Sequence, residues 1–255
     1  MKKWMWAVMI IIAVLLVAWL ALRVYVAHEE KKRSAVKGND KKYNVENLEK
    51  HAASVLTGKT IVFLGSSVTY GAASEGQSFV ELFETLDGVN CIKEAKSATT
   101  LVDKLSVSAL IVFGNGDSYV KRLKELDKEM SVDCVVCQLS TNDATMKQLI
   151  GEISDSNELS SFDTKTVTGA IEYIIRYCRD TWHCPVVFYT GSYYESDEYE
   201  AMVKRLYELQ DKWDIEIIDL YSDEAFNAID SETYHFYMYD PIHPTKAGYQ
   251  FILIA

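Results

Sequence analysis

The sequence contains little proline and glycine for its length. Of its 255 residues, 3 are proline and 12 are glycine, and they do not gather into a segment that would separate two domains. The 211 residues from position 45 onward are enough for one sizeable hydrophobic core. We therefore expect a single folded domain over residues 45–255.

This domain is also short of positive charge. The chain has 26 Lys and Arg and 37 Asp and Glu, of which 9 basic and 3 acidic residues precede position 45, so the domain holds 17 basic against 34 acidic residues. Phosphate backbones and anionic lipid headgroups are bound by clustered Lys and Arg. A net charge of −17 argues against a nucleic-acid partner.

Motifs for metals and nucleotide cofactors are missing as well. The 5 histidines show no H-E-x-x-H or similar spacing of ligands. Gly114 and Gly116 alone are too weak a pattern for a nucleotide-binding loop. We expect neither a bound metal nor a cofactor.

The 5 cysteines are an odd number, so at least one has no disulfide partner in the chain. Cys134 and Cys137 have the two-residue spacing of a redox or zinc pair, but they lie in the apolar run Val132–Leu139, which is typical of a buried strand. We favour small buried hydrophobic side chains for both. A disulfide between Cys178 and Cys184 stays an alternative if the domain lies outside the cell.

Apolar residues dominate the start of the chain. The nineteen residues Trp4–Leu22 carry no charge and are preceded by two lysines and followed by an arginine. At about 1.5 Å per residue the run is close to the thickness of a bilayer core, and it is longer than the apolar region of about 7 to 15 residues in a cleavable signal peptide. We predict an uncleaved transmembrane signal anchor over residues 1–27, although Ala27 leaves cleavage open.

Residues 28–44 are polar, charged and without apolar periodicity, so we expect a polar linker. The charges on either side of the apolar run predict which side of the membrane the domain lies on. Lys2 and Lys3 favour a cytoplasmic start, but Arg23 and the basic residues after it carry more positive charge, and a literal count points the other way. Short tails with paired lysines before one long apolar run resemble bacterial signal anchors. This resemblance favours a single-pass membrane protein with an extracytoplasmic domain.

The rest of the chain alternates between strand-like and helix-like segments. Apolar, β-branched runs recur at residues 60–64, 90–95, 132–139, 185–190 and 215–220. Helical spacing occurs between them, at about residues 78–86, 118–130, 166–181 and 197–212. Strands that are apolar on both faces and alternate with helices form a parallel sheet covered on each side. The predicted fold is α/β, a three-layer α/β/α sandwich with a five-stranded parallel sheet.

Three separate segments end apolar runs with groups suited to acyl transfer. Residues 61–67 read Ile-Val-Phe-Leu-Gly-Ser-Ser, residues 135–143 read Val-Val-Cys-Gln-Leu-Ser-Thr-Asn-Asp, and residues 240–244 read Asp-Pro-Ile-His-Pro. They supply a hydroxyl nucleophile, an amide donor, and a carboxylate three residues before an imidazole, which a serine hydrolase needs. Sites in open parallel sheets form beyond the carboxyl ends of the strands, where Ser67 and Asn142 fall.

Each of these residues also has a purely structural interpretation. Ser67 and Asn142 are residue types that cap helices. Asp240 followed by Pro241 is a common start of a turn, and His243 could be an ordinary loop histidine. Their joint occurrence in this order favours a catalytic role for all four.

The combined pattern resembles the SGNH/GDSL hydrolases, the family of GDSL-like lipases and acylhydrolases. Gly65–Thr69 is similar to the family's nucleophile block, with Ser66 where the name-giving motif has Asp. Ser140–Asp143 is similar to its Asn block and Asp240–His243 to its closing block. The resemblance covers residues 60 to about 250 and implies a flavodoxin-like fold in a membrane-anchored bacterial member of the family.

The resemblance also implies roles for particular residues. Ser67, Asp240 and His243 match the catalytic triad of the family. The backbone N–H groups of Ser67 and Ala98 and the side chain of Asn142 match its oxyanion hole. The implied activity is that of a serine esterase that forms an acyl-enzyme with a small acyl ester, O-acetylated glycans being one candidate substrate.

Ala98 is a departure from the family's pattern. It follows the second strand, at the place where the family usually has a glycine. Alanine keeps the N–H donor if the backbone there does not need a positive φ; otherwise the oxyanion hole is distorted. Because loss of one oxyanion donor typically costs about 10² to 10³ in turnover, the substitution is compatible with a slow enzyme.

A second serine matches the letters Gly-Asp-Ser better than Ser67 does. Gly116-Asp117-Ser118 also follows an apolar run, but only 24 residues separate Ser118 from Asn142. That distance is too short for the helix, strand and oxyanion loop that lie between the two blocks in the family. We expect Ser118 to cap a helix or to lie in a loop that faces the site.

Substrate contacts and two alternative functions stay open at this stage. Tyr193, Tyr194 and Tyr239 flank the proposed site and are candidates for an acyl or sugar pocket, with surface packing as the equal alternative. An O-acyltransferase would use the same triad. A catalytically weak glycan-binding module is suggested by Ala98 and by the tail of only 12 residues after His243.

Overall fold

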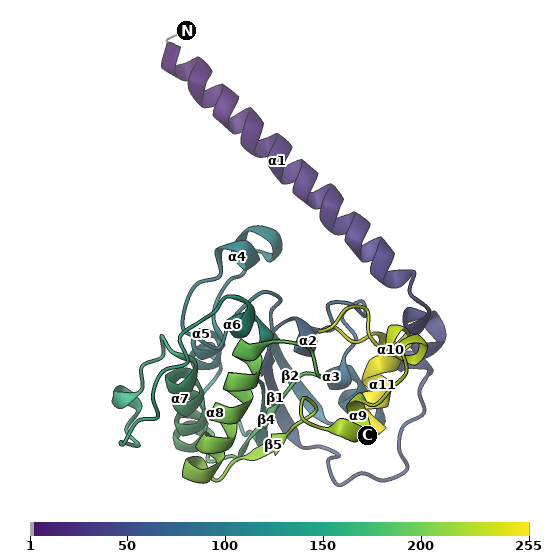
Figure 1. Ribbon diagram of the computed structural model, residues 1–255, viewed down its shortest axis with the longest axis vertical. Coiled ribbons are helices and arrows are strands. Elements are labelled where there is room, and N and C mark those ends of the chain that lie inside the picture. Colours follow the sequence, from purple (N-terminus) through teal and green to yellow (C-terminus); the bar gives the residue numbers. More distant parts are fainter. Residues whose placement is uncertain (1–2, 255) are drawn as a thin grey trace.

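The computed structural model describes residues 3–254, which form a parallel sheet flanked by helices and preceded by one long helix (Figure 1). The strands are β1 Thr60–Gly65, β2 Asn90–Ala95, β3 Cys134–Gln138, β4 Val186–Tyr189 and β5 Glu216–Ile218. All neighbouring strands pair in parallel, in the order β2-β1-β3-β4-β5. This is the flavodoxin-like order, in which the chain reverses direction across the sheet between β1 and β3. The predicted strands and fold class are confirmed.

The helices connect and cover these strands. They are α1 Lys3–Ser34, α2 Ser67–Tyr70, α3 Phe79–Leu82, α4 Val107–Phe113, α5 Tyr119–Glu125, α6 Thr141–Thr145, α7 Val167–Trp182, α8 Asp197–Trp213, α9 Glu224–Asn227, α10 Ser231–Tyr237 and α11 Lys246–Ile254. Short 3-10 turns lie at Lys37–Asn39, Lys41–Tyr43, Val45–Asn47 and Leu159–Ser161, and a π-helical turn lies at Phe83–Asp87.

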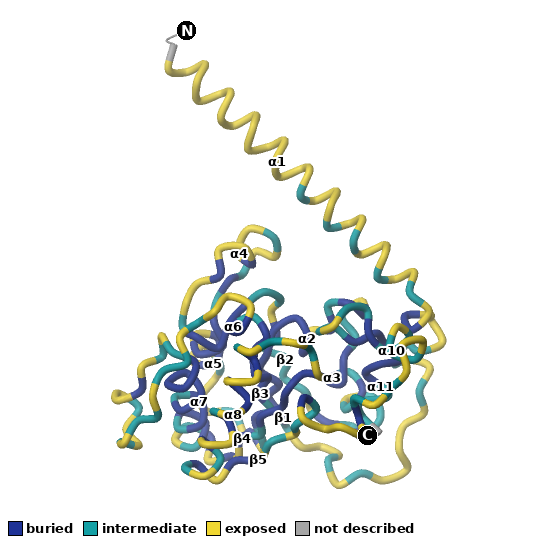
Figure 2. Tube along the Cα trace, in the orientation of Figure 1, coloured by how far each residue is buried: buried dark blue, intermediate teal, exposed yellow. Residues whose placement is uncertain are grey.

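The sheet is covered on both faces because its strands are apolar on both faces. In β1, Val62 and Leu64 belong to the larger core cluster, whereas Ile61 and Phe63 belong to a second cluster on the other face. Helices α5, α7 and α8 supply the larger cluster, and α3 and α11 supply the second (Figure 1). Figure 2 shows the central strands β1, β3 and β4 as mostly buried, whereas the edge strands β2 and β5 are largely intermediate or exposed. This arrangement is the expected three-layer sandwich.

Cys137, Cys178 and Cys184 are buried, and Cys91 and Cys134 are partly buried. Cys134 and Cys137 lie three positions apart on β3, so they face opposite sides of the sheet and pack in different core clusters. Burial raises the pKa of both thiols. Cys178 and Cys184 are both free, so the disulfide that the sequence left open is not formed.

Helix α1 is long and apolar enough to cross a membrane, and its apolar stretch is not buried in the domain. It continues to Ser34, beyond the predicted end of the anchor at residue 27. Lys37–Asn39 and Lys41–Tyr43, within the predicted polar linker of residues 28–44, form 3-10 turns that contact the domain. Asn39 explains this packing, because its buried side chain donates to the carbonyl of Ala73 at 2.6 Å and accepts from the backbone N–H of Lys246 at 2.9 Å. The boundaries of anchor, linker and domain stay predictions.

Candidate active site

The turn after β1 holds Ser67 at the carboxyl edge of the sheet. The strand ends at Gly65, and α2 begins at Ser67. A side chain at position 65 has no room, since an added Cβ would lie 1.6 Å from Oγ1 of Thr69. The missing side chain therefore lets the chain turn sharply from strand to helix, and the Ser67 side chain stands at the first turn of α2.

Three of the predicted residues meet at this edge. The Oγ atom of Ser67 lies 2.8 Å from Nε2 of His243, although 176 positions separate the two residues. On the other side of the ring, Nδ1 of His243 lies 2.8 Å from Oδ2 and 2.9 Å from Oδ1 of Asp240. The imidazole thus bridges the hydroxyl and the carboxylate, the arrangement in which a histidine takes a proton from a serine.

The spacing of Asp240 and His243 is set by the local turn. Oδ1 of Asp240 accepts hydrogen bonds of 2.9 Å from the backbone N–H groups of Ile242 and His243. This Asx-type turn folds the loop back so that the imidazole reaches the same carboxylate. The turn that the structural interpretation proposed is therefore present, and it also orients the histidine.

The charge state of Asp240 follows from its contacts. Burial opposes ionisation of this carboxyl, but the hydrogen bond from His243 and the backbone N–H groups of Ile242 and His243 outweigh it, so its pKa is lowered. Asp240 is consequently a carboxylate at neutral pH. A carboxylate in this position stabilises an imidazolium on His243.

Ala98 and Asn142, the other two predicted oxyanion residues, lie on segments that adjoin the turn of Ser67. Gly65 pairs with Ala95 in the neighbouring strand, and the N–H of Lys96 donates to the carbonyl of Gly65 at 3.2 Å. The loop with Ala98 therefore leaves β2 beside the nucleophile turn. Asn142, in α6 after β3, donates from Nδ2 to the carbonyl of Thr99 at 2.8 Å. A side-chain amide has two hydrogens, so this contact leaves one for a ligand.

Ala98 adopts the left-handed backbone conformation that glycine adopts most easily. Its φ is 61°. A non-glycine residue in this region carries roughly 1–2 kcal/mol of strain because its Cβ approaches the following carbonyl oxygen. The question left open by the sequence is thus answered for the backbone: a positive φ is required here, and alanine adopts it under strain.

Asp143 holds the same loop in place through hydrogen bonds to its backbone, a role that sequence reasoning missed. Its buried carboxylate accepts from the backbone N–H of Leu101 at 2.8 Å and of Val102 at 3.1 Å. Burial raises its pKa to about 6. In the sequence Asp143 appears only as the last residue of the segment Ser140–Asp143, which gives no sign of these backbone partners.

Gln138 is a second residue that the sequence analysis did not single out. Its side-chain oxygen accepts hydrogen bonds of 2.9 Å from the N–H of Ser66 and from the hydroxyl of Thr69, on either side of Ser67. Thr69 is itself 2.6 Å from the hydroxyl of Tyr189. The signal was a lone polar residue at the end of the apolar run 132–139, where a buried amide needs partners.

Arg122 ties the ends of β1 and β2 together. The side chain is almost completely buried, and it donates to the carbonyl of Gly65 at 2.9 Å and to the carbonyl of Glu94. It also lies 3.6 Å from the carboxylate of Glu94. An arginine in a predicted helix gave no hint of this contact, which depends on the packing of α5 against the strand ends.

Among the remaining predicted residues only Tyr239 adjoins the triad, since its backbone N–H donates to the carbonyl of His243 at 2.9 Å. Ser118 caps α5 by accepting from the N–H of Lys121, which confirms the predicted helix cap. Tyr194 packs its ring 5.1 Å from that of Tyr199, and Tyr239 lies under the guanidinium of Arg33 at 5.6 Å. Tyr193 is half-exposed and stacks 5.2 Å from Tyr221. The structure therefore does not join the three candidate tyrosines in one pocket.

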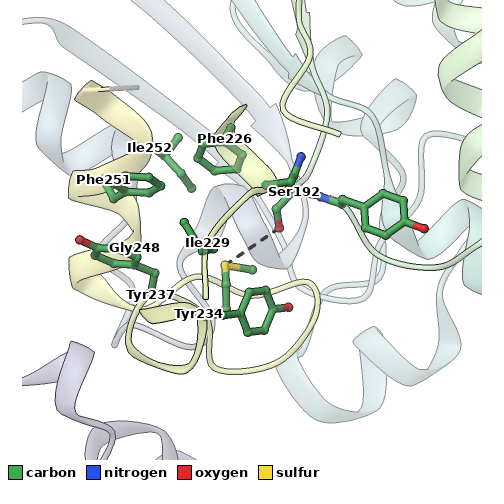
Figure 3. Close-up of a pocket in the computed structure, with 11 residues that line it drawn as sticks. Ser192, Phe226, Ile229, Tyr234, Tyr237, Gly248, Phe251 and Ile252 are labelled. Atoms are coloured by element: carbon green, nitrogen blue, oxygen red, sulfur yellow. Dashed lines mark hydrogen bonds between the residues drawn. The ribbon is translucent and has the colours of Figure 1, made fainter. Parts of the chain in front are cut away.

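An aromatic pocket adjoins the loop that carries His243 (Figure 3). Met238 belongs to this pocket and pairs with Pro244, next to His243. The labelled side chains that form its wall are Phe226, Ile229, Tyr234, Tyr237, Phe251 and Ile252. Tyr193 also contributes to the lining. Within residues 3–254, no group of three or more His, Cys, Asp or Glu side chains is arranged to hold a metal ion.

Comparison with solved structures places this site in a known fold. A protein from Lactobacillus plantarum superposes with a TM-score of 0.58 at 18% identity, over 77% of this chain and 93% of that chain. A protein from Bacteroides uniformis described as a GDSL-like lipase superposes with a TM-score of 0.54 at 18% identity, over 76% and 92%. Another so described, from Bacteroides ovatus, gives 0.53 at 16% identity, over 77% and 94%.

The chain has the SGNH/GDSL hydrolase fold. No protein-family model and no curated protein matches the sequence. At identities this low, the superpositions establish the SGNH/GDSL architecture alone. What the site does must be argued from its own geometry.

Proposed function

We propose that this protein is a serine esterase that cleaves small acyl esters, with Ser67 as nucleophile. The single observation that supports this most strongly is the contact of 2.8 Å between Oγ of Ser67 and Nε2 of His243, with Asp240 on the opposite ring nitrogen. A helix cap and a loop histidine do not require this contact. An acyl transfer through an activated hydroxyl does.

The proposed reaction begins with attack of Ser67 on the ester carbonyl. His243 removes the hydroxyl proton through Nε2 as the oxygen–carbon bond forms, and Asp240 stabilises the resulting imidazolium. His243 then gives the proton to the leaving alkoxide when the bond between carbonyl carbon and alcohol oxygen breaks. The product of this half-reaction is an acyl-enzyme on Ser67 and a free alcohol.

Water completes the cycle from the same positions. His243 removes a proton from a water molecule that attacks the acyl carbonyl, and Ser67 leaves with that proton as the acid is released. In both half-reactions the negative oxygen is stabilised by the N–H groups of Ser67 and Ala98 and by the free amide hydrogen of Asn142.

We further propose that the chain is a single-pass membrane protein with an extracytoplasmic domain and that α1 is its anchor. The length and composition of α1 support a membrane span. The orientation rests on the likeness of its start to bacterial signal anchors. Protease treatment of intact cells tests the orientation, because only an extracytoplasmic domain is cleaved.

Labelling with a fluorophosphonate tests the proposed nucleophile. The full chain is expected to be labelled, and Ser67→Ala is expected to lose the label. Ser118→Ala is the matched control, since it removes the other serine of a Gly-Asp-Ser-like segment and should leave labelling unchanged. A full-length, folded protein that is not labelled at Ser67 would be a binding module.

The acyl acceptor is tested separately with an ester and an added sugar. An esterase releases the acyl group to water and forms no acceptor-dependent product. Transfer to the sugar would instead identify an O-acyltransferase that uses the same acyl-enzyme. An O-acetylated glycan is the first natural substrate to try, and a panel of short and long acyl esters measures the chain-length preference.

A further inference from the structure

Helix α4 exposes an unusual amount of apolar surface. Its sequence Val107–Phe113 contains no charged residue, and of its side chains only that of Ala109 is buried. The large apolar side chains of the helix and of Leu105 just before it are between 44% and 61% exposed; they are Leu105, Val107, Leu110, Ile111 and Phe113. Contiguous apolar surface of this kind on a monomeric domain marks an interaction site.

The segments on either side of α4 are joined by a hydrogen bond between Ser106 and Gly116, so the helix projects from the domain in a fixed position. The N–H of Ser106 donates to the carbonyl of Gly116 at 2.8 Å, and the Ser106 side chain caps the helix at Ala109. Position 116 has no room for a side chain, since an added Cβ would lie 2.1 Å from the Ser106 carbonyl oxygen. These contacts hold both ends of α4 together and keep the helix folded at the surface of the domain.

Helix α1 leaves the domain and extends past the side from which α4 projects (Figure 1). The junction between α1 and the domain is held by hydrogen bonds. Arg33 donates to the carbonyl of Ala72 at 3.0 Å, and Asn39 joins the carbonyls of Arg33 and Ala73. Nζ of the buried Lys246 lies 2.6 Å from a carboxylate oxygen of Glu75 and also donates to the backbone carbonyl of Asn39. These contacts fix the domain relative to its anchor.

We propose that α4 is a membrane-docking element that inserts its apolar side chains into the bilayer that holds α1. This inference rests on the proposed anchoring of the protein by α1. The bilayer is the occupant that the structure favours, because α1 brings it to the side of the domain on which α4 projects. The acidic domain repels anionic headgroups, so contact through an uncharged apolar helix is the mode that remains.

Docking through α4 defines the class of substrate for the proposed esterase. The chain enters α4 directly from the loop of residues 98–102, which Asp143 holds through the N–H groups of Leu101 and Val102. Docking therefore brings the proposed oxyanion loop toward the lipid surface. The substrate is an ester carried by a membrane amphiphile, whose apolar part stays in the bilayer while its acyl ester reaches Ser67.

A fluorescent label at Ile111 tests the docking in the full chain. Ile111→Cys is labelled with an environment-sensitive dye and reconstituted into phosphatidylcholine vesicles with or without doxyl-labelled lipid. Native thiols are poor competitors, since burial raises the pKa of Cys91 to about 12 and also raises that of Cys134. Val55→Cys is the matched control, because Val55 is 93% exposed in the loop before β1, at the opposite edge of the sheet.

The dye at position 111 is expected to be quenched by doxyl lipid, and the dye at position 55 is not. Equal quenching at the two positions, or none at either, overturns the docking. Shielding of position 111 that depends on protein concentration and not on doxyl lipid would identify a second copy as the occupant and would also overturn it.

Activity measured on an embedded and on a soluble ester distinguishes a failure of membrane docking from a failure of the proposed esterase. The triple variant Leu110→Ser, Ile111→Ser, Phe113→Ser is expected to lose at least about tenfold of its activity on an ester embedded in vesicles, since burial of even one large apolar side chain in the bilayer contributes about that factor. Its activity on a soluble acetate ester should be unchanged, which also shows that it folds. Equal activity of both proteins on the embedded ester overturns the inference and leaves the esterase in place. Absence of wild-type activity on both esters, with position 111 quenched, overturns the esterase alone.

Discussion

The side-chain amide of Asn142 donates a hydrogen bond of 2.8 Å to the carbonyl oxygen of Thr99. Asn142 follows β3, and Thr99 follows β2 on the far side of β1, so the contact spans the strand that leads to Ser67. One amide hydrogen holds the loop of Ala98, and the other is free for a ligand. Asn142 therefore positions the loop of Ala98, and under the proposed mechanism its second amide hydrogen is an oxyanion donor.

Replacing Asn142 by alanine removes this donor. We expect kcat for a soluble acetate ester to fall by about 10² to 10³, the usual effect of losing one oxyanion donor, with a smaller change in KM. Steady-state kinetics measure the two constants. Thr145→Ala, on the same helix, is the control and should keep wild-type kinetics; an unchanged kcat in Asn142→Ala would remove Asn142 from the mechanism.

Replacing Ala98 by glycine is expected to stabilise the protein. The change relieves the left-handed strain and adds backbone freedom to the unfolded chain, so the net gain in unfolding free energy is roughly 0.5–1 kcal/mol. Thermal unfolding in detergent measures it. Ala95→Gly, at a buried strand position, should be destabilising. A loss of stability in Ala98→Gly would contradict the strained conformation.

The carboxyl of Asp143 makes stability depend on pH. Its pKa is about 6 in the folded protein and 3.8 is its ordinary value, so between these values the folded state binds more protons than the unfolded chain. The contribution of this group is fully present below the lower value and is lost as pH rises through about 6. Relative to Asp143→Asn, the wild type should be more stable at about pH 4 than at pH 7, by up to about 3 kcal/mol. A difference of opposite sign in unfolding free energy would refute this assignment.

Asp240→Asn is expected to lower kcat by about 10³ to 10⁴, because an amide can hold the imidazole in the wrong tautomer and cannot stabilise its cation. The amide oxygen still accepts from the N–H groups of Ile242 and His243, so the loop is retained. Asp230→Asn is the matched control, since Asp230 also accepts backbone N–H groups in its own loop. Equal kinetics of the two variants would show that Asp240 serves only the turn.

Sequence reasoning reached the fold because strands and turns are local patterns, and it paired Ser67 with His243 through the resemblance of their motifs to the SGNH/GDSL hydrolases. Each buried strand is a short apolar run, and a parallel sheet brings the residues after β1 and β3 to one edge. The turn of Asp240 is likewise local, since its carboxylate binds N–H groups two and three residues on. Such signals can be read without knowing what packs against them.

The missed residues depend on contacts between distant segments. Gln138 and Arg122 look like a strand end and an exposed helix residue in the sequence, and their partners lie on β1 and β2. The packing of residues 37–47 escaped prediction for the same reason, because Asn39 is buried by Lys246 and Ala73. Tyr194 was chosen for its place in the chain, and its ring packs against Tyr199 instead.

The mass of the acyl-enzyme tests the proposed mechanism most directly. The full chain is mixed with a p-nitrophenyl acetate substrate, quenched in acid during turnover, digested and analysed by mass spectrometry. We expect an acetyl group on the peptide that contains Ser67, at its hydroxyl, and no such adduct in His243→Ala. Ester hydrolysis that proceeds while Ser67 stays unmodified, or that acetylates Ser118 in its place, would contradict the proposed mechanism.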